Sequence, residues 1–87
     1  MKKVWFDRAW DDYLYWQGQD KKTIKKLNRL IKDIERGDDK GIGQTEILSG
    51  DLSGFCSKAI DESNRLVYRV ENGMIEILQC KGHYNDK

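Results

Sequence analysis

The spacing of the apolar residues changes part-way along this chain, and that change limits the fold more than any other feature. Between residues 7 and 37 they recur every three or four positions, as on one face of a helix. From residue 55 onward they recur at every second position, as in strands with one buried face. Helices followed by strands predict an α+β domain, in which the helices pack on a mainly antiparallel sheet.

Two helices are predicted in the first part of the chain. Asp7 is expected to cap the first helix, which should end near Gly18. Asp20 is expected to cap the second, and Gly37 stands where a glycine commonly ends a helix. Because so few residues separate the two, they should form an antiparallel hairpin. The second helix carries an apolar stripe at helical spacing, made of Ile24, Leu27, Leu30, Ile31 and Ile34.

Strands are predicted on both sides of this helical hairpin. A short apolar run at residues 3–6 precedes it, and the runs that follow lie at residues 55–60, 65–70 and 74–81, with residues 44–48 as a shorter candidate. Asn72-Gly73 is the strongest short signal for a hairpin between two strands. The predicted order is therefore β-α-α-β-β-β-β. We expect the last strand to keep its pairing almost to Gly82.

Composition narrows the class of protein. The 87 residues fit a single domain, residues 1–87. A net charge of +1 means that any affinity for nucleic acid must come from local patches. No run is long and apolar enough for a membrane span, and the N-terminus lacks the apolar region of a signal peptide, so we expect no membrane contact and a cytoplasmic location. Cys56 and Cys80 are too few for a zinc site; we expect two buried thiols and predict no metal or other cofactor.

Cations are concentrated on the second predicted helix. Two interpretations are open: an ordinary solvated face, or a surface that binds RNA or the ribosome by attracting phosphate. The cations are Lys21, Lys22, Lys25, Lys26, Arg29 and Lys32.

Four side chains form a candidate catalytic set. A carboxylate, a guanidinium, an imidazole and a phenol are sufficient to cleave RNA by acid–base chemistry. A hairpin closed at Asn72-Gly73 brings Arg65 to the end of the sheet that holds His83, the single histidine of the chain. Sequence does not fix the position of the carboxylate. The set is Glu46, Arg65, His83 and Tyr84.

Each of these residues also has an ordinary structural explanation. Glu46 would be a surface acid, and His83 would be an exposed histidine near a terminus. Arg65 would form a salt bridge with Glu62 or Glu76.

Four short motifs make the chain resemble the YoeB/Txe toxins of bacterial toxin–antitoxin modules, within the RelE/ParE superfamily. They are residues 10–16 (WDDYLYW), 52–55 (LSGF), 65–68 (RLVY) and the terminal His83-Tyr84, and the resemblance extends over residues 4–84. It implies a compact fold like that of microbial ribonucleases. It also implies an endoribonuclease that cuts messenger RNA in the ribosomal A site and is restrained by a YefM-type antitoxin; a homodimer is a further possibility.

The resemblance also implies roles for single residues. Glu46 would take the proton of the RNA 2′-hydroxyl, Arg65 would neutralise the phosphate, and His83 would protonate the leaving 5′-oxygen. Tyr84 would orient the phosphate or stack on a base. The products would be a 2′,3′-cyclic phosphate and a 5′-hydroxyl, formed without a metal. The residues expected to contact RNA or the ribosome are Lys21, Lys22, Lys25, Lys26, Arg29, Lys58 and Lys81.

The chain departs from the family pattern at two places. Residues 45–50 read TEILSG where the family usually reads PEPLKH, and residues 56–60 read CSKAI where it reads WSRRI. Fewer cations near the phosphate predict weaker stabilisation of the transition state and weaker RNA binding. A ribosome- or antitoxin-binding protein with weak or lost ribonuclease activity is therefore an open alternative. Others are a ribosome-independent ribonuclease and a gyrase poison of the ParE branch, in which Glu46 and His83 would have no purpose.

Overall fold

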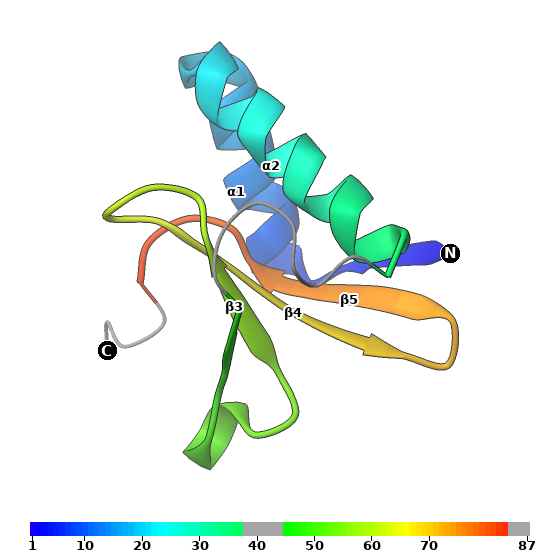
Figure 1. Cartoon of the computed structure of the whole chain (residues 1–87). Helices are drawn as coiled ribbons and strands as arrows, with labels where there is room; N and C mark the ends of the chain where they lie inside the picture. Colours follow the sequence, from blue (N-terminus) through cyan, green and yellow to red (C-terminus); the bar gives the residue numbers. More distant parts are fainter. Residues whose placement is uncertain (38–44, 84–87) are drawn as a thin grey trace.

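The computed structural model describes residues 1–37 and 45–83, in which two helices pack against one face of a five-stranded sheet (Figure 1). The α+β class predicted from the sequence is confirmed. In chain order the elements are β1 (Lys2–Trp5), α1 (Asp7–Gln19), α2 (Lys21–Glu35), β2 (Thr45–Ile47), the short 3-10 helix η1 (Gly50–Leu52), β3 (Cys56–Ala59), β4 (Arg65–Glu71) and β5 (Met74–Gln79).

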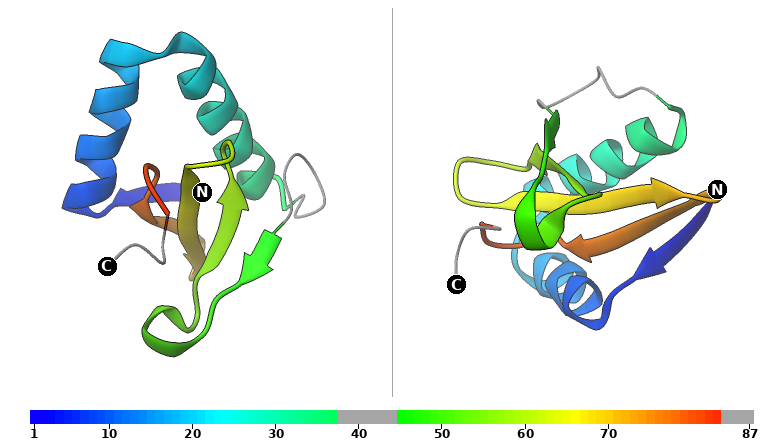
Figure 2. Two further views of the ribbon diagram at one scale, coloured as in Figure 1. Left: turned by 90° about the vertical axis from the view of Figure 1, so that its left-hand side faces the viewer. Right: turned by 90° about the horizontal axis from the view of Figure 1, so that it is seen from below.

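The sheet has the strand order β1-β5-β4-β3-β2. β1 runs parallel to β5, and all the other neighbouring pairs are antiparallel. Figure 2 shows the two helices diverging from their junction, so that α1 lies towards the β1 side of the sheet and α2 towards the β3 side. The helices connect β1 to the opposite edge of the sheet, and β4 is left as its central strand.

The hairpin between β4 and β5 closes at Asn72-Gly73, as predicted. Both residues have positive φ, 54° and 73°, which a two-residue turn of this kind requires. The register then shifts by one residue, because Tyr68 lies opposite Ile77 while Val67 lies opposite Gln79. Regular pairing of β5 ends at Gln79 rather than at residue 81, the predicted end. Beyond Gln79, a backbone hydrogen bond to β4 is made, from the N–H of Arg65 to the carbonyl of Gly82.

The predicted cap residues are found at both ends of α2, whereas the predicted cap of α1 is not. The carboxylate of Asp20 caps α2 by accepting hydrogen bonds from the backbone N–H groups of Lys22 and Thr23. Gly37, with φ +76°, follows α2 as predicted. The prediction that Asp7 caps α1 is wrong, since the cap position is Phe6, whose N–H donates to Ile77 and continues the sheet. Neither helix of the described chain has the length and apolar character that crossing a membrane requires.

The main core lies between the helices and the sheet. The apolar stripe of α2 packs there as predicted, with Leu27 and Leu30 fully buried against Leu66 and Ile77. A second, smaller cluster lies on the opposite face of the sheet. It is formed by Leu48, Phe55 and Val67, with Leu52 and Leu78 packed against it.

This core makes a direct test of the packing of α2 possible. Leu27→Ala should lower the free energy of unfolding by about 2–5 kcal/mol, because it removes a fully buried side chain and leaves a cavity. The matched control is Leu14→Ala on α1, where the side chain is 45% exposed and the loss should be small. Urea unfolding of both variants measures the difference, and equal losses would contradict this description of the core.

Candidate active site

Three neighbouring strands bring a carboxylate, a hydroxyl and a guanidinium together. Glu46 on β2 lies directly opposite Ser57 on β3 in the strand register. The Arg65 side chain of β4 reaches across both, because its Nε donates to Ser57 Oγ at 2.9 Å and its Nη2 lies 3.1 Å from Glu46 Oε1. The predicted salt bridges of Arg65 to Glu62 or Glu76 are replaced by this pair with Glu46.

The alternation of β4 sets the face on which this group lies. Leu66 and Tyr68 belong to the core under the helices, and Val67 belongs to the cluster on the opposite face. Arg65 shares the face of Val67 because side chains two apart in a strand point the same way. We call this the open face of the sheet. There the side chain of Arg65 is 15% exposed and that of Glu46 is 51% exposed, so both reach solvent.

The backbone connects Arg65 to His83. The N–H of Arg65 donates to the carbonyl of Gly82 at 3.0 Å, so β4 holds the residue immediately before His83. The N–H of Gly82 in turn donates to the side-chain carbonyl of Asn64 at 2.8 Å. Regular pairing stops at Gln79, short of the predicted extent, but this one backbone hydrogen bond reaches Gly82 and brings half-buried His83 to the Arg65 end of the sheet. Tyr84 lies outside the described residues.

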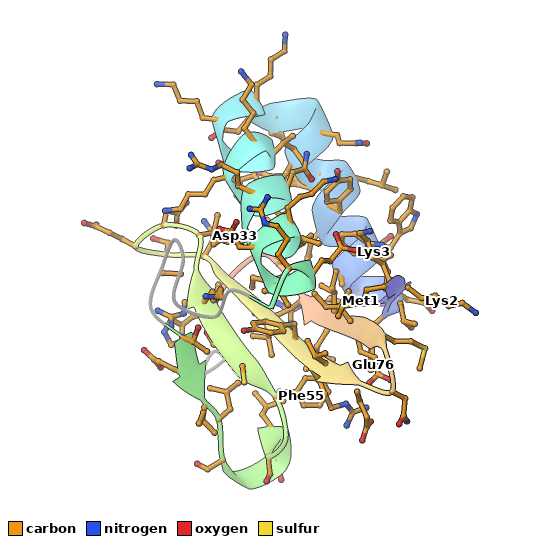
Figure 3. All side chains as sticks on the ribbon, turned by 45° about the vertical axis from the view of Figure 1, so that its right-hand side comes forward. Met1, Lys2, Lys3, Asp33, Phe55 and Glu76 are labelled. Atoms are coloured by element: carbon orange, nitrogen blue, oxygen red, sulfur yellow. The ribbon has the colours of Figure 1, made fainter. Side chains whose placement is uncertain are left out.

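Apolar side chains line the open face from Val67 towards the end of β4 that lies away from Arg65. Phe55 lies on the side of the sheet away from α2 (Figure 3). The guanidinium of Arg69 lies 4.6 Å above its ring and also pairs with Glu76. Phe55 and Arg69 therefore lie further along the sheet than the pair of Arg65 and Glu46, and within β4 Val67 is the residue of this cluster nearest to Arg65.

Two other features of the described residues do not contribute to this group. A hollow of about 450 Å³ lies between the end of α2 and β4, and Glu46, Arg65 and His83 are not among its lining residues. Cys80 is a buried thiol, as expected, and burial raises its pKa to about 12, so it stays protonated and unreactive at neutral pH. Cys56 is only half-buried, which the sequence did not indicate.

The cations predicted to bind RNA or the ribosome differ in exposure: some are exposed, two are half-buried, and Lys58 is fully buried. Those on the outer side of α2 are exposed, and side chains ending in nitrogen project from the far end of the helical hairpin in Figure 3. Lys26 and Lys81 are half-buried, and Lys81 Nζ lies 4.4 Å from the ring centre of Tyr15. The exposed residues are Lys21, Lys22, Lys25 and Arg29.

Lys58 does not fit its predicted role. Its side chain has no exposed surface, and it pairs in register with Thr45 and Leu66. Because Ser57 occupies the open face, alternation turns Lys58 to the face under the helices. We correct the sequence-based prediction accordingly and do not include Lys58 in the RNA-binding surface.

Sequence reasoning missed two residues that organise the group. Ser57 holds the guanidinium of Arg65, and Asn64 holds the backbone next to His83. Ser57 lies inside the predicted strand at residues 55–60 and is fully buried, and a buried serine hydroxyl needs a hydrogen-bond partner. Asn64 directly precedes β4, and its side chain accepts a hydrogen bond from the N–H of Gly82 in the last segment of the described chain.

Comparison with known proteins agrees with the resemblance noted in the sequence. Residues 5–84 match the family model of the YoeB-like toxins of bacterial type II toxin–antitoxin systems. The chain is 49% identical to the toxin YoeB of Escherichia coli K12 over 84 residues, which cover 97% of this chain and all of that protein.

Solved structures give the same result. The YoeB/ParE toxin from Agrobacterium tumefaciens superimposes with a TM-score of 0.90 at 41% identity, covering 97% of this chain and 100% of that one. The toxin in a heterotetrameric YoeB–YefM complex from Staphylococcus aureus gives 0.88 at 41% identity, covering 97% and 98%, and a YoeB dimer from the same organism gives the same score.

The contact between Ser57 and Arg65 leads to a prediction about stability. Ser57→Ala should lower the free energy of unfolding by about 1–3 kcal/mol, because the partly buried guanidinium loses this hydrogen-bond acceptor. Ser53→Ala, at an exposed serine on the loop before β3, is the control and should change it little. Equilibrium unfolding in urea measures both variants. Identical stability of the two would show that Ser57 does not hold Arg65.

Proposed function

The chain belongs to the YoeB-like toxins of bacterial type II toxin–antitoxin systems, and from this premise we propose that it is a metal-independent endoribonuclease that cuts messenger RNA in the ribosomal A site. The observation that best supports this proposal is the contact of Arg65 with Glu46 at 3.1 Å on the open face, beside the segment that leads to His83. Three different strand ends supply these groups, and their chemistry matches what cleavage of a phosphodiester requires. Such a protein would act in the cytoplasm.

The proposed reaction uses the hydroxyl of the RNA itself. Glu46 removes the proton of the 2′-hydroxyl, and the resulting oxyanion attacks the adjacent phosphorus. Arg65 offsets the charge that grows on the non-bridging oxygens, for which its planar fork of donors is suited. His83 gives a proton to the 5′-oxygen as its bond to phosphorus breaks. A 2′,3′-cyclic phosphate and a 5′-hydroxyl result.

The ion pair of the ligand-free protein has a place in this scheme. A scissile phosphate that approaches Arg65 competes with Glu46 for the guanidinium, and a carboxylate released from this pair is a better base for the 2′-hydroxyl. Histidine suits the acid role because its imidazole ring can both give up and take back a proton during a reaction cycle. Tyr84 is assigned to orienting the phosphate or stacking on a base, in keeping with aromatic side chains in RNA sites.

Binding to the ribosome would supply the position of the messenger RNA. The exposed cations of α2 form a surface that can attract ribosomal phosphate, and docking fixes the reacting groups relative to one another. The net charge of +1 makes this local surface, rather than the whole protein, the source of affinity.

Two protein partners are proposed from the relatives. A YefM-type antitoxin would restrain the enzyme, as the Staphylococcus aureus complex indicates for its own toxin. We propose that an acidic, partly apolar segment of it covers Arg65 and His83, since the charge and the apolar side chains of the open face would both be matched. Self-association into a homodimer is proposed on the same basis.

A second function is favoured by the positions of the cations. Lys58 is buried and Ala59 lies at the strand end next to Arg65, so two positions at which the family usually has arginine bring no exposed cation to this site. A protein with the same fold could then bind the ribosome or antitoxin with weak or lost ribonuclease activity. Cleavage assays separate the two functions.

Cleavage tests the proposed chemistry directly. His83→Gln and Glu46→Gln should each slow single-turnover cleavage of ribosome-bound messenger RNA by roughly 10²- to 10⁴-fold, the usual contribution of one general acid or base. A 2′-deoxy nucleotide at the cleavage position should abolish the reaction, because the nucleophile is gone. Primer extension locates the cut and measures the rate.

The control for this assay is Glu71→Gln, which removes an exposed carboxylate at the opposite end of β4 and should cleave normally. Thermal melts confirm that each variant is folded. Wild-type rates from well-folded His83→Gln and Glu46→Gln proteins would refute the assigned roles, and an inactive wild-type chain that still binds ribosomes would establish the second function.

Docking is tested by charge reversal on α2. Changing Lys21, Lys22 and Lys25 together to Glu should weaken co-sedimentation with ribosomes and flatten its salt dependence, because fewer counterions are released on binding. The control changes the same three residues to Arg, which keeps the charge and should retain binding. If both variants co-sediment like the wild type at low and high salt, α2 is an ordinary solvated helix.

A further inference from the structure

The segment just before His83 is held by side chains from elsewhere in the chain. We call residues 80–82 the pedestal, because His83 follows directly from them. The N–H of Cys80 donates to Asp12 Oδ2 at 3.1 Å, and its carbonyl accepts from Trp16 Nε1 at 2.8 Å. The N–H and the carbonyl of Cys80 are therefore both bound by side chains of α1 rather than by a strand.

The other two pedestal residues are also hydrogen-bonded to distant segments, Lys81 to α1 and Gly82 to the start of β4. The carbonyl of Lys81 accepts from Arg8 Nη2 at 3.1 Å. Gly82 donates to the side chain of Asn64 and accepts from the N–H of Arg65. With φ +80° it takes a conformation that favours glycine, and a β-carbon there would meet Arg8 Nη2 at 3.5 Å. Arg8 thus fits closely around the last turn of the chain before the histidine.

The α1 residues of this arrangement form one row. Arg8, Asp12 and Trp16 are spaced four apart, which places them one above another on the same helix face. Arg8 Nε also lies 3.7 Å from Asp12 Oδ2, so the two side chains support each other. The row faces the end of β5, where regular strand pairing stops at Gln79.

The row includes the carboxylate of Asp12, which is largely buried, and a buried charge is unfavourable unless it has a specific partner. The side chain of Asp12 is only 13% exposed. Burial raises the pKa of Asp12, while the hydrogen bond from Cys80 and the charge of Arg8 act in the opposite direction. An acid needed only for solubility would sit in water, as Asp11 does one residue earlier. The position of Asp12 is accounted for by its hold on the pedestal.

We propose that Arg8, Asp12 and Trp16 are positioning residues that hold the pedestal, and through it the imidazole of His83, in place for proton transfer. The inference rests on the proposed function, in which His83 is the general acid. Such an acid must come within about 3 Å of the leaving oxygen. Residues near a chain end lose this precision unless they are tied down. Regular strand pairing ends at Gln79, four residues before His83, and beyond it the α1 row holds the pedestal together with the backbone hydrogen bond between Arg65 and Gly82.

The test uses two variants: Arg8→Ala removes the hydrogen bond to Lys81 and the ion pair with Asp12, and Trp16→Phe removes the hydrogen bond to Cys80. The matched controls are Arg36→Ala, another exposed helix arginine with a nearby carboxylate partner, and Trp10→Phe, at an exposed tryptophan of α1. Thermal melts check folding. The first measurement is the backbone ¹⁵N order parameter of His83, which should fall in the two test variants and stay at the wild-type value in the controls.

The second measurement is single-turnover cleavage of two ribosome-bound substrates, one with the natural 5′-oxygen and one with a 5′-sulfur at the cut. In the sulfur substrate the 2′-oxygen still attacks phosphorus, but the P–S bond breaks to give a thiolate that needs no proton, since the reference pKa of a thiol is about 8.5. On the oxygen substrate the test variants should be slower by roughly 10- to 100-fold, a part of what a general acid contributes. On the sulfur substrate they should match the wild type, as His83→Gln should.

The outcomes separate the positioning role from the proposed function. An equal loss of rate on both substrates, or an unchanged order parameter of His83 in both test variants, overturns the positioning role and leaves Arg8 and Trp16 as ordinary packing residues. If the wild-type chain cuts neither substrate, the proposed function fails. In that case the order parameters still decide whether the α1 row holds His83.

Discussion

The burial of Leu66 and Tyr68 under the helices fixes the orientation of β4, and the candidate site depends on this orientation. Once these side chains enter the core, Arg65 and Val67 must face the other way. Shifting β4 by one residue would bury the guanidinium under α2 and expose two core residues, a change that the packing of the sheet forbids. Ser57 and Glu46 then meet Arg65 because neighbouring strands in register share the same alternation.

Much of this could be predicted from the sequence where a periodic pattern existed. The stripe of α2, the Asp20 cap and the Asn72-Gly73 turn are local signals, and together they led to the correct fold class and to Arg65 near His83. The position of Glu46 had no such signal, because β2 is three residues long and no turn motif connects it to α2. The error at Asp7 arose because the sheet continues through Phe6, a tertiary effect that a capping rule does not include.

The balance of charge at the site differs from what the family motif alone suggests. The family usually has two arginines after its serine, whereas this chain has a lysine and an alanine, and the lysine is buried. Arg65 contacts the carboxylate of Glu46, and Ser57 holds the same guanidinium through a second contact. A site built in this way relies on placing one guanidinium accurately, which favours a substrate that arrives already positioned.

The parallel pairing of β1 with β5 affects when the protein can become folded. Lys2 pairs with Met74, so the first strand finds its partner only near the far end of the chain. Contacts this distant in sequence form late and slow the search for the native state. Both helices precede β5 in the chain, so β1 can pair with β5 only after the residues of β5 have been made. In the function proposed above, the reacting set is complete only after β5 has been made, because His83 follows β5 in the sequence.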